Sequence, residues 1–188
     1  MPDAERVRRT ASKAVVGGFR PPEDPLASWS GGVRVAAPGE KWPLGLELPM
    51  VAIAQFNLDE PPFLPDALKD LSLITIFADR GGVPVLGRSN GEGWVLRAYE
   101  SLDMLVEIDP PRDVGHTRPF PIQWELAVDD YDEGTKLGGR PNLVQGDITI
   151  PGEFVIQLGV EEKSHVALGD NAYICRDGDS WSMEVQFY

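Results

Sequence analysis

Apolar residues along this chain follow the two-residue period of β-strands in most places. Residues 122–128 and 181–187 alternate apolar and polar side chains, which predicts strands with one buried and one wet face, as in antiparallel sheets. Residues 51–56 and 154–158 form almost continuously apolar runs. Such runs belong at the centre of a sheet, where both faces are covered.

Two segments follow helical spacing instead. Residues 3–16 carry Ala and Val at helical intervals and end before two glycines, which predicts an amphipathic N-terminal helix. Residues 65–71 begin with Pro and hold two leucines three positions apart, which predicts a second helix. Two more strands are expected over 94–99 and 102–108. Together these elements predict an α+β fold that is predominantly antiparallel β.

The same β-unit occurs twice along the chain. Three landmarks recur in the same order, at offsets of 107, 102 and 98 residues: Gly31 and Gly138, Gln55 and Gln157, Ile76 and Ile174. A drift of this size is what the trimming of loops between two copies produces. We therefore expect internally duplicated β-units packed around a shared core.

Two parts of unequal length are expected. Residues 1–25 form the N-terminal helix and a Pro-rich connector. Residues 26–188 form a single domain built of two related halves, at about 28–100 and about 120–188.

Composition indicates a cytoplasmic protein. No segment approaches the roughly 20 apolar residues that span a bilayer, and the charged N-terminus lacks the apolar region of a secretory signal. The single cysteine, Cys175, forms no internal disulfide, which fits a reducing compartment.

Net charge narrows the class of partner. The chain carries −13 in total. Residues 1–20 hold five basic and two acidic groups, a net of +3, so the other 168 residues carry −16. Such a field disfavours nucleic acid and anionic membranes and favours a basic protein partner, although acidity can also serve solubility alone.

Short motifs give the chain a family resemblance over residues 28–188. They are Gly31-Gly32, Trp42-Pro43, Ala54-Gln55-Phe56-Asn57-Leu58, Phe77-Ala78-Asp79, Lys136 to Pro141, Gln145-Gly146-Asp147, Ile156-Gln157-Leu158 and Leu168-Gly169-Asp170. In order and spacing they resemble the YwqG-like family of bacterial proteins of undefined function. Leu168 stands where that family usually has Trp. The resemblance implies a duplicated, mainly β fold without an established reaction. Some members occur beside secreted-toxin systems, which implies immunity or partner binding.

Buried polar residues at matching repeat positions are the first site candidates. Gln55 and Gln157 interrupt apolar runs, and a buried amide must find hydrogen-bond partners. We favour a structural role in which each clamps the backbone of the other repeat; the alternative is that they line a shared groove. The candidate cleft comprises Gln55, Asp79, Gln145, Asp147, Gln157 and Asp170. Asp79, Asp170 and Asp177 end apolar strands and either cap turns or meet there as an acid–base or metal-binding cluster.

An acidic run supplies the candidate docking surface. It consists of Asp129, Asp130, Tyr131, Asp132 and Glu133 and lacks the spacing of a calcium-binding loop. A solvated loop is one reading of it. The other is a surface for Lys or Arg of a partner, with the tyrosine as an aromatic anchor.

Sequence motifs for catalysis, metals and cofactors are missing. The glycine pairs lack the pattern of a phosphate-binding loop, and His116 and His165 stand in no zinc motif. Cys175 lies in an apolar strand, as an inert core thiol does, although a Cys175–His165 dyad stays open. Trp42 is expected in the core, with an exposed stacking platform as the alternative.

Three hypotheses follow. The first is a non-enzymatic protein with an acidic docking surface, of the immunity type that neutralises a basic toxin. The second is a small-ligand-binding protein or enzyme that uses a cleft between the repeats. The third is a subunit of a larger bacterial assembly.

Overall fold

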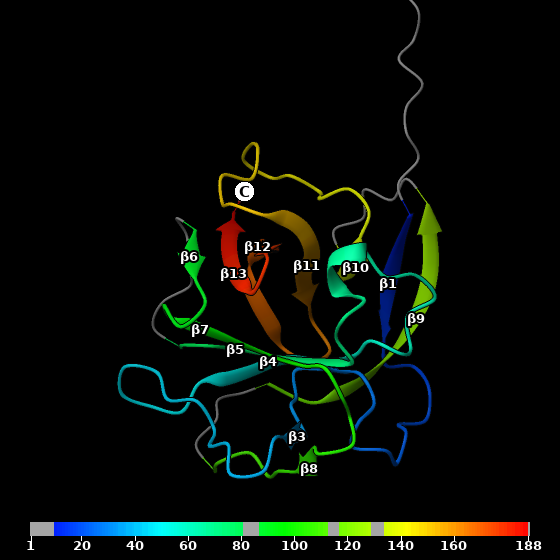
Figure 1. The fold of residues 1–188 in the computed structure, drawn as a ribbon, viewed down its shortest axis with the longest axis vertical. Helices are drawn as coiled ribbons and strands as arrows, with labels where there is room; N and C mark the ends of the chain where they lie inside the picture. The colour runs from blue at the N-terminus through cyan, green and yellow to red at the C-terminus, as the bar shows by residue number, and fades with distance from the viewer. Residues whose placement is uncertain (1–9, 81–86, 113–116, 129–133, 188) are drawn as a thin grey trace, which may run out of the picture.

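A computed structural model describes residues 10–80, 87–112, 117–128 and 134–187, and these residues form an all-β protein. One antiparallel sheet of 11 strands curls into a half-barrel, and a sheet of two strands lies beside it (Figure 1). The predicted α+β class is wrong, because no α-helix occurs in the described ranges. Accordingly, no helix there is long and apolar enough to cross a membrane.

The elements fall into two sets along the chain. The first set is β1 (Thr10–Val16), β2 (Trp29–Ser30), β3 (Val35–Ala36), β4 (Val51–Asn57), the 3-10 turn η1 (Asp66–Leu68), β5 (Leu73–Ala78), β6 (Arg88–Ser89), β7 (Trp94–Tyr99) and β8 (Val106–Glu107). The second set is β9 (Phe120–Val128), β10 (Lys136–Gly138), β11 (Glu153–Glu161), β12 (Val166–Asp177) and β13 (Ser180–Gln186).

The N-terminal helix predicted over 3–16 is wrong where the structure describes it. Thr10–Val16 is strand β1, which pairs along its whole length with β9 and through three residues with β10. Backbone pairing on both sides outweighs the weak helical spacing of Ala and Val in this segment. Residues 1–9 lie outside the described ranges.

Two other predicted elements are shorter than expected. The helix expected over 65–71 is only the single 3-10 turn η1, and the strand expected over 102–108 is only β8. The strands expected over 51–56, 94–99, 122–128, 154–158 and 181–187 are confirmed as β4, β7, β9, β11 and β13.

Strand order interlocks the two halves of the chain. The order is β6-β13-β12-β11-β10-β1-β9-β2-β4-β5-β7. Strand β1 precedes β2 in sequence but pairs with β10, and β9 precedes β10 in sequence but pairs with β2. Each half therefore contributes its first strand to the sheet of the other half, and β1 pairs with β9 to make the sheet continuous.

Strand register relates the landmarks of the two halves. Gln55 pairs with the residue just before Ile76, and Gln157 pairs with the residue just before Ile174. Ser30, just before Gly31, pairs with Ala54, just before Gln55. In the second half, Leu137, just before Gly138, pairs with Ile156, just before Gln157. This correspondence supports the interpretation that the chain contains one β-unit twice.

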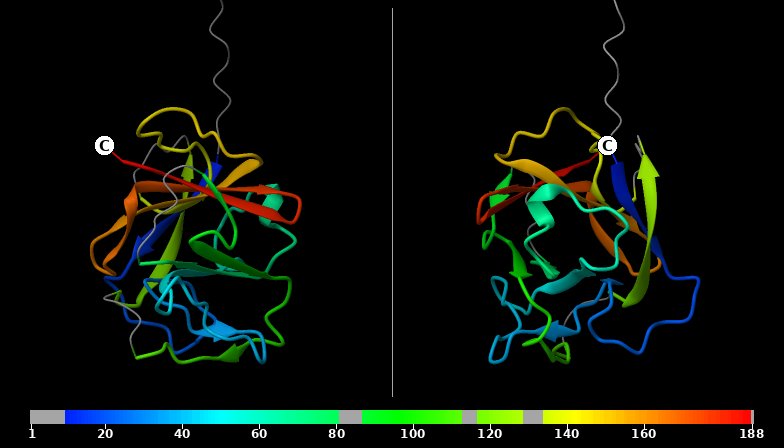
Figure 2. Two further views of the ribbon diagram at one scale, coloured as in Figure 1. Left: turned by 90° about the vertical axis from the view of Figure 1, so that its left-hand side faces the viewer. Right: turned by 45° about the vertical axis from the view of Figure 1, so that its right-hand side comes forward.

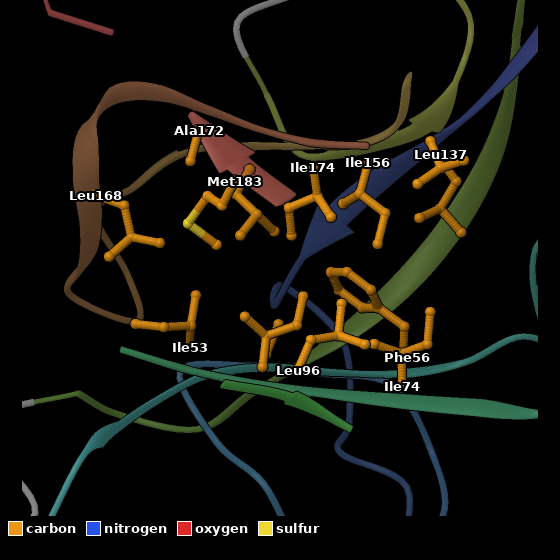
Figure 3. Close-up of a cluster of buried hydrophobic side chains, with 14 of the residues drawn as sticks. Ile53, Phe56, Ile74, Leu96, Leu137, Ile156, Leu168, Ala172, Ile174 and Met183 are labelled. Atoms are coloured by element: carbon orange, nitrogen blue, oxygen red, sulfur yellow. The ribbon is translucent and has the colours of Figure 1, made fainter. Parts of the chain in front are cut away.

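The core lies inside the curl, between the two halves. The β12–β13 hairpin lies above β4, β5 and β7 (Figure 2), and side chains from both layers meet between them (Figure 3). Figure 3 shows the first half below and the second above, with Ile53, Phe56, Ile74 and Leu96 facing Leu137, Ile156, Leu168, Ala172, Ile174 and Met183. Burial of this apolar surface is the main favourable term for joining the halves.

A polar bridge joins the halves at one end. The guanidinium of Arg176 on β12 donates to both carboxylate oxygens of Asp70 after η1, at 2.5 and 2.7 Å, and to the carbonyl oxygen of Ala67 at 2.5 Å. The same guanidinium stacks over the Trp181 ring, 5.2 Å from its centroid. Paired hydrogen bonds of this kind fix geometry better than a single ion pair.

Loops cover the outer faces of both halves. Val33, Met50, Ala52 and Phe77 form a second small core outside the first half, with Trp42 packed against it. In the second half, Glu184 and Gln186 on β13 are buried. The wet face predicted for residues 181–187 is therefore wrong, because the segment that follows β10 folds over it.

Candidate functional site

Gln55 is a fully satisfied structural clamp. Its amide nitrogen donates to the carbonyl oxygens of Pro25 at 2.7 Å and Ala27 at 2.8 Å. Its amide oxygen accepts from the backbone N–H groups of Arg34 at 2.8 Å and Val35 at 3.2 Å. Its side chain therefore holds the chain on both sides of β2.

Gln157 does the same in the second half. Its oxygen accepts from the N–H of Asn142 at 2.7 Å, and its nitrogen donates to the carbonyl of Gly134 at 3.0 Å. Both amides clamp the segment around the glycine pair of their own half. The expected structural role fits this geometry, but the expected partner, the other repeat, is wrong. Sequence spacing cannot show which half lies within reach of a side chain.

Gln186 is a clamp that sequence reasoning missed. Its oxygen accepts from the N–H groups of Val144 at 3.0 Å and Gln145 at 2.9 Å, and its nitrogen donates to the carbonyl of Gly146 at 3.1 Å. Gln145, a predicted cleft residue, is held here by its backbone while the residue itself is exposed. The available signal was that Gln186, like Gln55, is an amide between apolar residues.

Glu184 is held next to this clamp. Burial opposes its ionisation, but hydrogen bonds from Thr149 and Gln186 outweigh that effect and lower the pKa of Glu184. The hydroxyl of Thr149 donates to it at 2.6 Å and the backbone N–H of Thr149 at 2.9 Å. The carboxylate is thus committed to holding the covering loop, which is a structural role.

The predicted cleft aspartates lie on different segments of the fold. Asp79 follows β5 and accepts from the N–H of Leu46 at 3.0 Å, whereas Asp147 is exposed in the loop after β10. Asp170 lies within β12, and Asp177 ends that strand beside the turn to β13. Among the described residues, no three His, Cys, Asp or Glu side chains are grouped so that they could hold a metal ion.

A pocket between the halves contains one of these aspartates. It measures about 280 Å³, and Asp79, Arg80 and His165 lie at its rim. Gln55 and Gln157 do not line it. Apolar side chains from both halves form its floor: Val51, Ile53, Ala78, Val166 and Leu168. In Figure 3, Ile53 and Leu168 face each other from opposite layers at this side of the core.

The cysteine and histidine candidates have different surroundings. Cys175 is buried, and desolvation, with a smaller contribution from Glu184, raises its pKa to about 11. A pKa that high keeps the thiol protonated near neutral pH, which opposes a nucleophilic role. His165 is exposed in the turn before β12 and takes a positive φ of 57°. His116 lies outside the described residues.

Trp42 packs within the small outer core. Its indole N–H donates to the carbonyl of Met50 at 2.8 Å, and its ring meets Phe77 edge to face with centroids 5.1 Å apart. It also borders a pocket of about 310 Å³ beside Gly31-Gly32 and Arg34. The core reading is therefore favoured over a free stacking platform.

A shallow groove gathers carboxylates from both halves. Its volume is about 820 Å³, and we name it the acidic groove. Charged residues along it are Asp66, Lys69, Asp70, Glu153, Arg176, Asp177 and Asp179, five acids against two bases. Three of the acids come from the second half: Glu153 begins β11, Asp177 ends β12, and Asp179 lies in the turn between β12 and β13.

Charges in the acidic groove are unevenly paired. Asp66 meets Lys69 at 2.6 Å, and Asp70 meets Arg176, whose hydrogen bonds lower the pKa of Asp70. The other three carboxylates, Glu153, Asp177 and Asp179, are exposed, and none forms an ion pair with a described residue. Asp179 also interacts electrostatically with Arg176, so what the groove presents is a net negative charge, from five acids against two bases. The predicted docking run, 129–133, lies outside the described residues.

Comparison with known proteins adds no relative. No protein-family model matches the chain, and no curated protein matches it. The resemblance to the YwqG-like family thus stays a prediction that depends on the quoted motifs.

Proposed function

We propose that this protein is a cytoplasmic binding protein that docks a basic protein partner on its acidic surface. The observation that carries the proposal is the acidic groove, where Glu153, Asp177 and Asp179 lie exposed beside the ion-paired Asp66 and Asp70. Complementary charge on a partner speeds association and rejects acidic competitors.

The geometry of the polar residues supports binding as the activity. Gln55, Gln157, Gln186 and Glu184 hold backbone segments, and Cys175 is a buried thiol. These side chains stabilise the fold, and along the whole chain 30 acidic residues outnumber 17 basic ones. The residues after position 20 carry −16, which extends the negative field beyond the groove.

A basic toxin is the partner class that we propose within this function. Its support is the resemblance to a family with members beside secreted-toxin systems. An acidic groove imitates the charge of nucleic acid, so it suits a partner whose own substrate is an anionic polymer. Immunity is then the direct consequence of covering that partner's cationic site.

Neutralising the acidic groove is expected to weaken partner binding. The variant carries Glu153→Gln, Asp177→Asn and Asp179→Asn, and its matched control carries Asp59→Asn, Glu100→Gln and Asp103→Asn at exposed positions outside the groove. The partner protein is first recovered from the native host by affinity capture. We expect the Kd of its complex with the groove variant to be about tenfold higher or more than with the wild type, because electrostatic steering and close charge pairs are lost. Raising salt from about 50 to about 500 mM weakens the wild-type complex similarly.

Two results would contradict this proposal. A partner whose Kd is indifferent to salt rules out acidic docking as a whole. If instead the control variant weakens binding as much as the groove variant, the charge acts globally and not at the groove. Neutralising Asp129, Asp130, Asp132 and Glu133 separately shows whether that run is the docking surface.

The pocket between the halves favours a second candidate function, binding of a small ligand. An apolar floor under a polar rim of Asp79, Arg80 and His165 suits a compact apolar molecule with one polar group. A ligand at about 100 times its Kd adds about 2.7 kcal/mol of stability. For a chain of this length, that corresponds to a rise in Tm of about 5–10 °C.

A metabolite library screened by thermal unfolding tests this candidate. Ala167→Trp at the exposed edge of the pocket fills its mouth and is expected to abolish the stabilisation. If no compound raises Tm, or if the Trp variant responds as the wild type does, the pocket is not the binding site.

A further inference from the structure

Three leucines are exposed together on the hairpin that leads into β4. We name residues 43–50 the leucine hairpin; Leu44 is 73% exposed, Leu46 91% and Leu48 46%. In Figure 1 the segment before β4 extends away from the sheet at the left of the view. Single exposed apolar residues are common on soluble proteins, but a contiguous group on one projection marks an interaction surface.

The leucine hairpin has a defined shape. Gly45 N–H donates to the Leu48 carbonyl at 2.8 Å, and Met50 N–H donates to the Pro43 carbonyl at 3.0 Å. The carboxylate of Asp79 accepts from Leu46 N–H at 3.0 Å and packs against Gly45, where an added Cβ would lie 2.6 Å away.

These contacts preorganise the projection. Its backbone is held by its own hydrogen bonds and by Asp79, the residue after β5, so little conformational freedom remains to be lost on binding. Asp79, predicted as a cleft residue, thereby positions the three leucines.

Charge selects the class of occupant. The tip carries Glu47 between Leu46 and Leu48, and residues 43–50 contain no Lys or Arg; the nearest basic residue along the chain is Lys41. Anionic bilayers repel such a tip, and interfacial elements that bind them usually carry basic residues. Two hairpins of this chain would oppose each other with like charge. A complementary surface is an apolar groove with a basic rim.

We propose that the leucine hairpin docks into an apolar groove, bordered by Lys or Arg, on a protein partner. None of its residues lines the acidic groove. The inference therefore goes beyond the proposed acidic docking and is tested separately from it. Leu46 is the central anchor, because it is the most exposed of the three and lies at the tip.

Site-specific photocrosslinking in the native host tests this proposal. Benzoylphenylalanine replaces Leu46, and in a control chain it replaces Leu126, which is 59% exposed on β9. We expect adducts at position 46 with a different protein, mapped to an apolar segment that has Lys or Arg beside it. The Leu126 control gives no such adduct. With that protein purified, Leu46→Ser is expected to raise Kd about tenfold, whereas Leu126→Ser leaves Kd unchanged.

As a control for folding, the Tm of Leu46→Ser and of Leu126→Ser is compared with that of the wild type; equal values show that the fold is intact. The proposal is overturned if position 46 gives no adduct, gives adducts only with lipid or a second copy of this chain, or if Leu46→Ser binds as the wild type does. Co-sedimentation with phosphatidylcholine vesicles, with and without phosphatidylglycerol, tests whether the hairpin binds lipid. If the wild type sediments with the vesicles and Leu46→Ser does not, the hairpin is a membrane-binding element and the proposal is wrong.

Discussion

Gln55→Ala is expected to lower the free energy of unfolding by about 3–5 kcal/mol. The substitution removes four hydrogen bonds and leaves the carbonyls of Pro25 and Ala27 and the N–H groups of Arg34 and Val35 without their amide partner. Each buried polar group left unsatisfied costs about 1–3 kcal/mol, and partial relaxation keeps the total below the sum. Urea denaturation monitored by tryptophan fluorescence measures the loss.

Two further variants separate the clamp from packing. Gln55→Met fills nearly the same volume but makes none of the four bonds, so we expect it to be destabilised by about as much as the alanine variant. Gln145→Ala changes an exposed amide whose backbone alone is held, and is expected to stay within about 0.5 kcal/mol of the wild type. Wild-type stability for Gln55→Met would show that the amide contributes only volume.

The clamps illustrate what sequence could predict here. An amide that interrupts an apolar strand must be satisfied, and its recurrence in a second strand identified Gln55 and Gln157 as a pair. Their partners could not be predicted, because they depend on which loop covers the outer face of each half. Both amides hold loops of their own half.

Strand β1 illustrates where local pattern fails. Ala11, Ala14 and Val15 fit a helix as well as a strand, and nothing in residues 10–16 shows that β9 and β10 lie on both sides. The choice is made by pairing partners more than a hundred residues away. The same limit applies to Glu184 and Gln186. They alternate with apolar residues, which predicts a solvent-exposed face, but a loop distant in sequence covers that face and buries them.

Surface sites were the hardest to predict. The acidic groove joins η1 in the first half to Glu153 and the β12–β13 turn in the second, so its carboxylates are far apart in sequence. In the sequence, the leucine hairpin is a short apolar segment between Pro43 and Pro49, with nothing to indicate that it is exposed. Only the structure shows that its leucines point away from the core, since an apolar residue in sequence is normally expected inside.

Gly31→Ala is expected to destabilise the protein by about 2–5 kcal/mol, the second large effect. Gly31 takes a positive φ of 71° directly after β2, where an L-residue is strained by about 1–2 kcal/mol. An added Cβ would also lie 2.5 Å from the carbonyl oxygen of Arg118 and 2.8 Å from Cβ of Ser164. Both are on segments of the second half of the chain, so relief of the clash requires the halves to separate locally.

Gly39→Ala isolates the contribution of backbone strain. Gly39 has a similar φ of 83°, but an added Cβ there meets nothing within 4 Å. We therefore expect a loss of about 1–2 kcal/mol from strain alone. The difference between the two variants, measured by urea denaturation, reports the close approach of the halves at Gly31. If the two variants lose the same free energy of unfolding, the segments of Arg118 and Ser164 move aside at no cost. The interlocked strands, and not tight packing at this turn, would then hold the halves together.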